Sequence, residues 1–244
     1  MNKGFKITIN TALIGLLGFS TYKIGFKLYD YKKASSTYDS IEEVYNDKSS
    51  KKENPYTELK VLNPDYRFWI EIENTNVNYP VVQGTDNINY LTKDFHQKNS
   101  SSGTIFLDHR NNIKEDFNNL VYGHNMKNKT IFNNVENYKE EEFFRANNKI
   151  TLTDDKYKYT YEVFSVYLAD GNIDASTHTD INASMDTSKI KSYIDSLKTK
   201  SLHKTDIEVT PYDKILSLVT CSYESSDMRT IVHAKLINTE DFQT

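Results

Sequence analysis

The chain has a single cysteine, Cys221, in 244 residues. One thiol cannot form a disulfide within the chain, so this covalent means of stabilising an exported domain is excluded. Glycine and proline are also scarce, at eight and four residues, whereas there are eighteen tyrosines and twelve phenylalanines. That balance favours a β-rich domain whose strands carry aromatic side chains.

Positive charge is not in excess. The 30 lysines and arginines are outnumbered by 34 aspartates and glutamates, which gives a formal net charge of −4. This argues against a nucleic-acid-binding protein whose affinity rests on basic patches. The apolar fraction of 37% and the charged fraction of 26% allow a packed core and argue against wholesale disorder.

No apolar run reaches the length of a full membrane span, although one near the N-terminus comes close. Residues 7–22 are sixteen uncharged residues between Lys6 and Lys23, whereas a span needs about 20. Snorkelling lysines can extend such a segment, and a cleaved secretory signal has a hydrophobic region of similar length. Because no small-x-small cleavage pattern follows the run cleanly, we predict an uncleaved signal anchor over residues 1–29, with the rest of the chain exported.

Residues 30–62 are predicted to form a juxtamembrane helix and linker. Polar residues 49–55 favour the linker. Before them, an apolar stripe at helical spacing indicates an amphipathic helix that lies against the domain or forms a stalk. The stripe consists of Tyr31, Ala34, Tyr38, Ile41 and Tyr45.

The compact domain is predicted to begin near Asn63 and to be mostly β. Asp186–Lys198 predicts a helix with a capping residue at its start, and part of 130–146 is also helical. Many short strands with few inserted helices favour a barrel or sandwich, and Pro80 predicts an edge strand or a bulge. The strands are predicted at 67–72, 77–82, 103–107, 119–123, 149–153, 157–168, 214–221 and 229–237.

Cys221 ends one predicted strand and Arg229 begins the next. If these strands are antiparallel neighbours, the two residues lie near each other when register and facing allow. A lone thiol in an exported protein is either a small buried hydrophobe or a reactive group. Composition alone favours the buried hydrophobe.

A reactive thiol needs a basic partner, because a free cysteine is mostly protonated at neutral pH. His124 follows an apolar strand, as Cys221 does, and strand ends on a rigid scaffold often carry catalytic groups. His233 competes with it, since it shares a strand face with Arg229. The sequence does not decide between the two histidines.

A metal site at Asp108 and His109 is conceivable, because both residue types bind metals. However, no H-E-x-x-H motif is present and no second histidine stands at helical spacing. We therefore expect neither a metal nor another cofactor.

Three motifs, in order, resemble a class B sortase, one of the cysteine transpeptidases of Gram-positive cell surfaces. They are Y-G-H-N at 122–125, L-x-T-C at 218–221, and Arg229. The K-N-K-T-I-F segment after the histidine, the C-x-Y-E continuation and the helix before the cysteine strand strengthen the resemblance, which covers residues 63–238. One departure is Ser217, where the family commonly has threonine; the hydroxyl is retained.

The resemblance implies a closed sortase-type β-barrel over residues 63–244. It implies that Cys221 attacks a threonine carbonyl in the C-terminal sorting motif of a secreted protein, often N-P-x-T-x-like in this class. His124 would be the general acid and base, and Arg229 would stabilise the oxyanion or hold the substrate. A peptidoglycan amine would accept the protein, with the catalytic domain held on the extracellular face of the cell membrane. Further candidates for orienting the histidine or lining the groove are Tyr122, Asn125, Glu224 and Asp227.

Two other classes of protein remain as alternatives. Papain-like or amidase-type peptidases carry the cysteine at the start of a helix and ahead of the histidine, which is the reverse of the order here. A membrane-tethered, non-enzymatic β domain that binds a surface ligand would keep Cys221 buried and inert.

Overall fold

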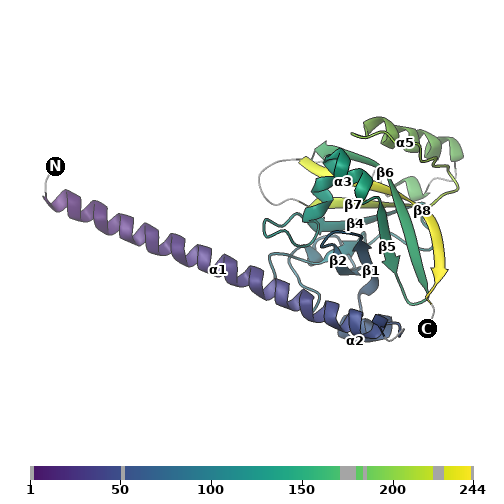
Figure 1. Cartoon of the computed structure of the whole chain (residues 1–244). Coiled ribbons are helices and arrows are strands. Elements are labelled where there is room, and N and C mark those ends of the chain that lie inside the picture. The colour runs from purple at the N-terminus through teal and green to yellow at the C-terminus, as the bar shows by residue number, and fades with distance from the viewer. Residues whose placement is uncertain (1–2, 51–52, 171–179, 184–185, 222–227, 243–244) are drawn as a thin grey trace.

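Figure 1 shows the computed structural model of the chain, which describes residues 3–50, 53–170, 180–183, 186–221 and 228–242. Eight strands form a closed barrel in the order β1-β2-β3-β4-β7-β8-β6-β5, from which one long helix projects. The prediction of a mostly β fold with a closed barrel is confirmed. The elements are α1 (Lys3–Ser50), α2 (Tyr56–Leu62), β1 (Tyr66–Ile72), β2 (Asn78–Val82), η1 (Asn89–Leu91), β3 (Ile105–Leu107), β4 (Asn118–His124), η2 (Asn133–Lys139), α3 (Glu141–Ala146), β5 (Lys149–Thr153), β6 (Tyr157–Asp170), η3 (Ile181–Ala183), α5 (Thr187–Lys200), β7 (Ile215–Cys221) and β8 (Met228–Asp241).

The barrel combines antiparallel hairpins with two parallel pairs. β1 pairs with β2 and β5, and β8 pairs with β6 and β7, all antiparallel. β4 and β7 are parallel, as are β2 and β3. A parallel pair needs a long crossover, and β5, β6 and α5 lie in the crossover between β4 and β7. The C-terminal ends of β4 and β7 therefore lie at the same end of the barrel.

Apolar side chains fill the barrel and the space under its covering helices. Every residue of β4 is buried, as expected for a strand whose two faces both meet other parts of the protein. On α5, three apolar residues are buried, and the Asp186 carboxylate caps the helix by accepting from Ser188 N–H at 2.9 Å, as predicted. The largest fully buried side chains include Trp69, Tyr66, Tyr90, Tyr138, Tyr161, Phe68 and Phe95.

The α1 helix joins two different environments without a break. Its predicted apolar stripe packs on the barrel: Ala34, Tyr38 and Ile41 are buried, and the ring of Tyr45 stacks on Trp69 with centroids 4.0 Å apart. Its N-terminal half is exposed and projects away from the barrel (Figure 1). Among the described residues, α1 is the one helix long and apolar enough to cross a membrane, judged by length and composition.

The expectation of an edge strand or a bulge at Pro80 holds only locally: β2 has neighbours on both sides in the closed barrel, but Pro80 itself is paired on one side only. Pro80 lies opposite Trp69 of β1, and β3 pairs with β2 only from Val81 onwards. The missing N–H of proline thus precedes the β2–β3 ladder. The irregularity in register falls in β1, between Tyr66 and Phe68.

Candidate active site at the ends of three strands

Adjacent strands bring the three predicted site residues together at one end of the barrel. His124 of β4 is the direct parallel partner of Cys221 of β7. On the other side of β7, Val219 lies opposite Ile231 of β8. The ladder between β7 and β8 ends there, and beyond it the Thr230 N–H donates to the side chain of Thr220, at Oγ1, at 3.0 Å. Cys221 and Arg229 each lie two residues beyond that last pair, at the same end of the two strands.

Directly paired positions on neighbouring strands share one face of a sheet, and neighbouring strands lie about 4.8 Å apart. The backbone positions of His124 and Cys221 therefore lie next to each other on one face, and Arg229 lies near the start of β8, on the other side of β7. Arg229 also pairs with Ala169 of β6, and its side chain is partly exposed. β7 ends and β8 begins on the side of the barrel from which the N-terminal half of α1 projects (Figure 1).

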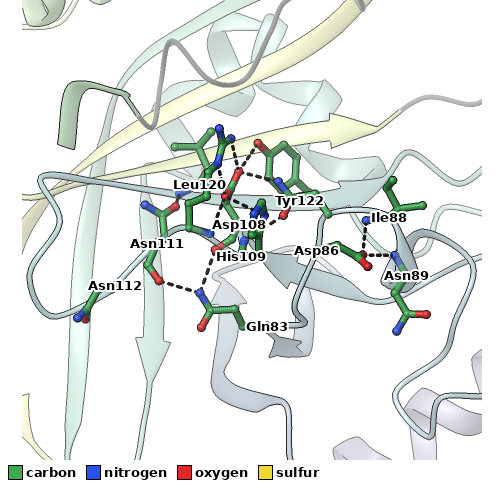
Figure 2. Close-up of polar contacts among 12 residues, drawn as sticks. Gln83, Asp86, Ile88, Asn89, Asp108, His109, Asn111, Asn112, Leu120 and Tyr122 are labelled. Carbon is green, nitrogen blue, oxygen red and sulfur yellow. Dashed lines mark hydrogen bonds and ion pairs between the residues drawn. The ribbon is translucent and has the colours of Figure 1, made fainter. Parts of the chain in front are cut away.

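The ring of His124 is held by a main-chain carbonyl. His124 is only 5% exposed, and its Nε2 lies 2.7 Å from the carbonyl oxygen of Leu91. A carbonyl oxygen can only accept, so Nε2 donates in this contact and the ring orientation and tautomer are set by it. Leu91 ends the short turn η1, whose first N–H groups are capped by Asp86: Ile88 and Asn89 each donate to Asp86 Oδ1 at 2.8 Å (Figure 2). The two hydrogen bonds lower the pKa of the Asp86 carboxyl.

Gly103 allows the turn and the histidine to approach each other. Its φ is +58°, in the left-handed region that favours glycine. A Cβ there would lie 2.7 Å from the carbonyl oxygen of Tyr90, 2.8 Å from that of Leu91 and 3.1 Å from His124 Cδ2. Any other residue at position 103 would push against both members of the His124–Leu91 hydrogen bond.

Packing explains why the Y-G-H-N motif is followed by K-N-K-T-I-F. A Cβ on Gly123 would lie 2.7 Å from the ring of Phe132, so glycine lets that ring cover the end of β4. The Phe132 N–H donates to the carbonyl oxygen of His124 at 3.0 Å, and Asn125 forms an isolated bridge with Ile131. The segment after the histidine folds back and fixes its backbone.

The buried carboxylate of Asp108 accepts hydrogen bonds from residues before and after it in the chain. The Asp108 side chain is fully buried, and it accepts from Arg110 at 2.9 and 3.0 Å, from Asn87 Nδ2 at 2.8 Å and from the Tyr122 hydroxyl at 3.1 Å. Burial alone would raise the pKa of Asp108, but the hydrogen bonds from Arg110 and Asn87 hold it below its usual range.

Two of the residues that donate to Asp108 lie close in sequence to His124 or to the turn that holds it. Tyr122 stands two residues before His124 in β4, and Asn87 adjoins the Asp86 cap of the turn that ends at Leu91. Figure 2 shows Asp108 and Tyr122 beside the Asp86 turn. Asp108 therefore positions groups around His124 and does not itself contact the histidine through any hydrogen bond described above.

The other residues considered from sequence have different partners. The amide of Asn125 accepts from Asn133 at 2.7 Å and donates to Glu136, so it ties the loop to η2. The Tyr122 hydroxyl donates to Asp108. Glu224 and Asp227 lie outside the described residues. The carbonyl of Leu91 had no sequence signal, because a main-chain oxygen is available at every position.

The competing histidine, His233, lies deep in the barrel wall. It is completely buried, and its Nδ1 is 2.7 Å from the Oγ of Ser217, its partner in β7. Position 221 is four residues further along β7, or about 13 Å at strand spacing. His233 is thus separated from the Cys221 position, whereas His124 is its ladder partner.

Metal ligands do not gather in the part of the chain that the structure describes. Within those ranges, no group of three His, Cys, Asp or Glu side chains is arranged to hold an ion. His109 Nδ1 lies 3.7 Å from Asp108 Oδ1, but that carboxylate is already engaged by Arg110 and Asn87.

Comparisons of sequence and of structure with known proteins find the same family. A family model described as a sortase domain matches residues 70–237. The chain is 31% identical over 243 residues to sortase B of Staphylococcus aureus (strain NCTC 8325 / PS 47), with 96% of this chain and 98% of that protein covered. The solved S. aureus sortase B–substrate complex has a TM-score of 0.79 at 30% identity, covering 86% of this chain and 98% of its own. The solved structure of Clostridium perfringens sortase B has a TM-score of 0.69 at 42% identity, and the match covers 75% of this chain and 99% of that one.

Proposed function

The chain belongs to the sortase B family of cysteine transpeptidases, and from that premise we propose that it anchors secreted proteins to the cell wall. Its substrates are proteins with a C-terminal sorting motif, which it cleaves at the carbonyl of a threonine. The acceptor is an amine of a peptidoglycan peptide. The observation that carries this proposal is the ladder pairing of His124 with Cys221 at the end of the barrel.

In the first half of the reaction, His124 takes the proton of the Cys221 thiol, the sulfur attacks the threonine carbonyl carbon, and the carbonyl π electrons move onto oxygen. Collapse of the tetrahedral intermediate breaks the C–N bond, and the amine leaves with a proton donated by His124. The product is a thioester between Cys221 and the threonine. In the second half, an incoming amine attacks this thioester, His124 takes the proton from its nitrogen, and the sulfur leaves.

The hydrogen bond to Leu91 suits His124 to this shuttle. Since Nε2 donates to the carbonyl, Nδ1 is the nitrogen that exchanges a proton in the neutral ring. The main-chain acceptor orients the ring, as the third member of a catalytic triad does.

Arg229 is proposed to stabilise the oxyanion or hold the substrate main chain. Its guanidinium carries a permanent charge and five donors in a planar fork. Its partly exposed position near the start of β8, the strand that pairs with the cysteine strand β7, supports this role. We further propose that α1 anchors the enzyme in the cell membrane with the barrel on the extracellular face, since the apolar half of the helix is exposed.

A peptide cleavage assay tests the proposal. The full chain is incubated in detergent with a library of threonine-containing sorting peptides and with a peptidoglycan-type amine. Wild-type protein should cleave a subset of peptides, carry the N-terminal fragment as an adduct on Cys221 in mass spectra, and join that fragment to the amine. Cys221→Ala should do none of these. Cleavage by Cys221→Ala, or an adduct on another residue, would contradict the assignment.

A further inference from the structure

The charges on α1 are segregated along its length. Its residues 23–33 contain Lys23, Lys27, Lys32 and Lys33 against one acid, Asp30. Two turns later, residues 39–47 contain four acids and no lysine or arginine. Lys32 and Lys33 are exposed, so packing on the barrel does not require them. The basic segment adjoins the apolar half of the helix, and the acidic segment lies farther from it.

The position of these lysines opposes the usual charge rule for membrane proteins. With the barrel outside, four lysines follow the apolar stretch on the outer side, whereas Lys3 and Lys6 precede it on the inner side. Lysines near a span favour the cytoplasmic side, so the outer four work against the required orientation. Acidic residues would keep this part of the helix as soluble as the lysines do. A positive surface at this height therefore suggests an anionic partner.

A loop of the barrel adds to the same basic surface. Asp30 accepts from Ser101, through the main-chain N–H at 3.3 Å and through the hydroxyl, which pins the loop 92–101 to α1. Within the loop, Asp94 accepts from the Lys98 N–H at 2.9 Å and so fixes the backbone at Lys98. Both His96 and Lys98 are exposed.

Between the helix and the loop lies an open hollow of about 470 Å³. Lys32 and Lys33 line it from α1 and His96 lines it from the loop, with three hydroxyl side chains and Tyr29 completing the lining. Cationic and hydroxyl donors around one hollow suit a phosphate group. We call Lys32, Lys33 and His96 around this hollow, together with the exposed Lys98 of the same loop, the membrane-proximal basic surface.

The geometry sets this surface at the height of lipid headgroups. Lys23 ends the apolar stretch, and Asp30, where the barrel loop is attached, is seven residues further along a continuous helix. Lys32 and Lys33 follow two and three residues later, so at 1.5 Å per residue they lie about 14–15 Å beyond Lys23. The headgroup region occupies about 5–8 Å of this, and the remainder is close to the Debye length of about 8 Å at physiological salt. The surface thus lies next to the headgroup layer, within range of its charge.

We infer that the membrane-proximal basic surface binds the headgroups of anionic phospholipids and holds the barrel against the bilayer. The inference rests on the proposed membrane anchor. Its consequence is a defined orientation: the loop 92–101 follows the turn that holds His124, and the ends of β4 and β7 lie on the side from which the apolar half of α1 projects (Figure 1). The site would face chemistry that takes place at the membrane surface.

Fluorescence quenching by a headgroup-labelled lipid tests this inference. Cys221→Ala removes the only native thiol, and Thr92→Cys, at an exposed position of the loop, accepts a single fluorophore. The labelled full chain is reconstituted into vesicles of phosphatidylcholine, with or without phosphatidylglycerol, that contain a spin-labelled headgroup. Quenching should be greater in the anionic vesicles and should fall as salt is raised from 0.1 to 1 M, because the Debye length shrinks from about 10 Å to about 3 Å.

A matched pair of triple variants locates the effect. Changing Lys32, Lys33 and Lys98 to glutamine should remove the difference between neutral and anionic vesicles. The control changes the exposed Lys189, Lys191 and Lys204 to glutamine, which alters net charge equally on and beyond α5, and should keep the difference. Equal quenching in both vesicle types, or equal loss in the control, overturns the inference. So does a response to free glycerol phosphate with no dependence on vesicle charge, which would assign the hollow to a soluble phosphate.

Two further measurements separate this inference from the function on which it rests. Release of the reconstituted chain from vesicles by alkaline carbonate would contradict the anchor itself. The triple glutamine variant with Cys221 intact should cleave sorting peptides in detergent at the wild-type rate. A chain that resists carbonate and cleaves peptides, yet ignores vesicle charge, would overturn the basic-surface inference alone.

Discussion

Two histidine sites flank the same strand, β7, and differ in what surrounds them. In the middle of β7, Ser217 lies between Asn118 of β4 and His233 of β8, 2.7 Å from a side-chain atom of each. At its end, Cys221 is the ladder partner of His124 of β4, and Arg229 lies near the start of β8 at the same end of the barrel. The same three strands thus carry a nucleophile-type residue and a histidine at two levels, four residues apart.

The hydrogen bonds of the inner site indicate a structural role for Ser217 and His233. A hydroxyl has one proton, and Ser217 donates it to the Asn118 side-chain oxygen, so His233 must donate to Ser217. This is the reverse of the polarity needed for a histidine to deprotonate a serine. The ring of Tyr167 stacks on His233, and Ser217, His233 and Tyr167 are all buried. At the outer site, the histidine donates to the main-chain carbonyl of Leu91 near the end of the barrel. Hydrogen-bond partner and position along the strands, not residue type, separate the two sites.

The sharpest way to break this comparison is to remove each histidine. His124→Ala should lower kcat for a sorting peptide by about 10²–10⁴, the usual contribution of a general acid–base group. His233→Ala should keep most of its turnover but melt at a lower temperature, because it empties a buried, hydrogen-bonded site. Steady-state kinetics and thermal melts of both variants decide the matter. If the kinetic effects were reversed, the base would be His233.

The third position of the outer site should come next in effect. Arg229→Ala should cost about 10²–10³ in kcat, as does the loss of an oxyanion donor elsewhere. Arg229→Lys should recover only part of this, since an ammonium lacks the planar fork. Arg145→Ala on α3, where the side chain is 60% exposed and pairs with Glu141, is the control and should change kcat little. A lysine variant as active as wild type would show that charge alone is needed.

The support of His124 can be probed through Gly103. Gly103→Ala should lower kcat on the order of 10–100-fold, because its Cβ would press on the Leu91 carbonyl and the histidine ring, and small displacements of catalytic groups are costly. KM should change less than kcat. Gly84→Ala is the control, because its Cβ would meet only the Tyr90 ring at 3.3 Å and the Asp86 carbonyl at 3.6 Å. An equal effect of both alanines on kcat would argue against this support.

The smallest kinetic effect is expected at the inner site. Ser217→Ala should leave kcat near its wild-type value but destabilise the fold by about 1–3 kcal/mol, since Asn118 and His233 lose a buried partner. Denaturant unfolding measures the change. Ser217→Thr retains the hydroxyl and should recover most of the stability if the extra methyl group is accommodated. A large loss of kcat in Ser217→Ala would mean that the two sites are coupled.

Local patterns predicted the elements of the fold well. The apolar stripe on α1, the cap at Asp186 and the strand ends at His124 and Cys221 all depend on residues close in sequence. The resemblance to class B sortases predicted the closed barrel, which periodicity alone left open between barrel and sandwich. Pro80 predicted an edge strand or a bulge, and β2 is an edge only at that residue, because β3 pairs with β2 from Val81 onwards.

The support of the site could not be predicted. Whether His124 or His233 lies beside Cys221 depends on the register of strands that are far apart in sequence. The Leu91 carbonyl could not be recognised from the sequence, because every residue has one. The importance of Gly103 follows only from its neighbours in space. The partners of Asp108, which approach it from both sides along the chain, are likewise set by the closed barrel. The catalytic roles themselves remain proposals from the family.

The parallel pairing of β4 with β7 also bears on the order of folding. Between them the chain forms β5, β6 and α5, so the two strands that carry His124 and Cys221 can meet only after a long loop has closed. Local hairpins such as β5–β6 should form earlier. Hydrogen exchange during refolding should therefore protect the β4–β7 amides late. An unfolded chain would carry its thiol without its histidine partner, and the two residues would become neighbours only as the barrel closes.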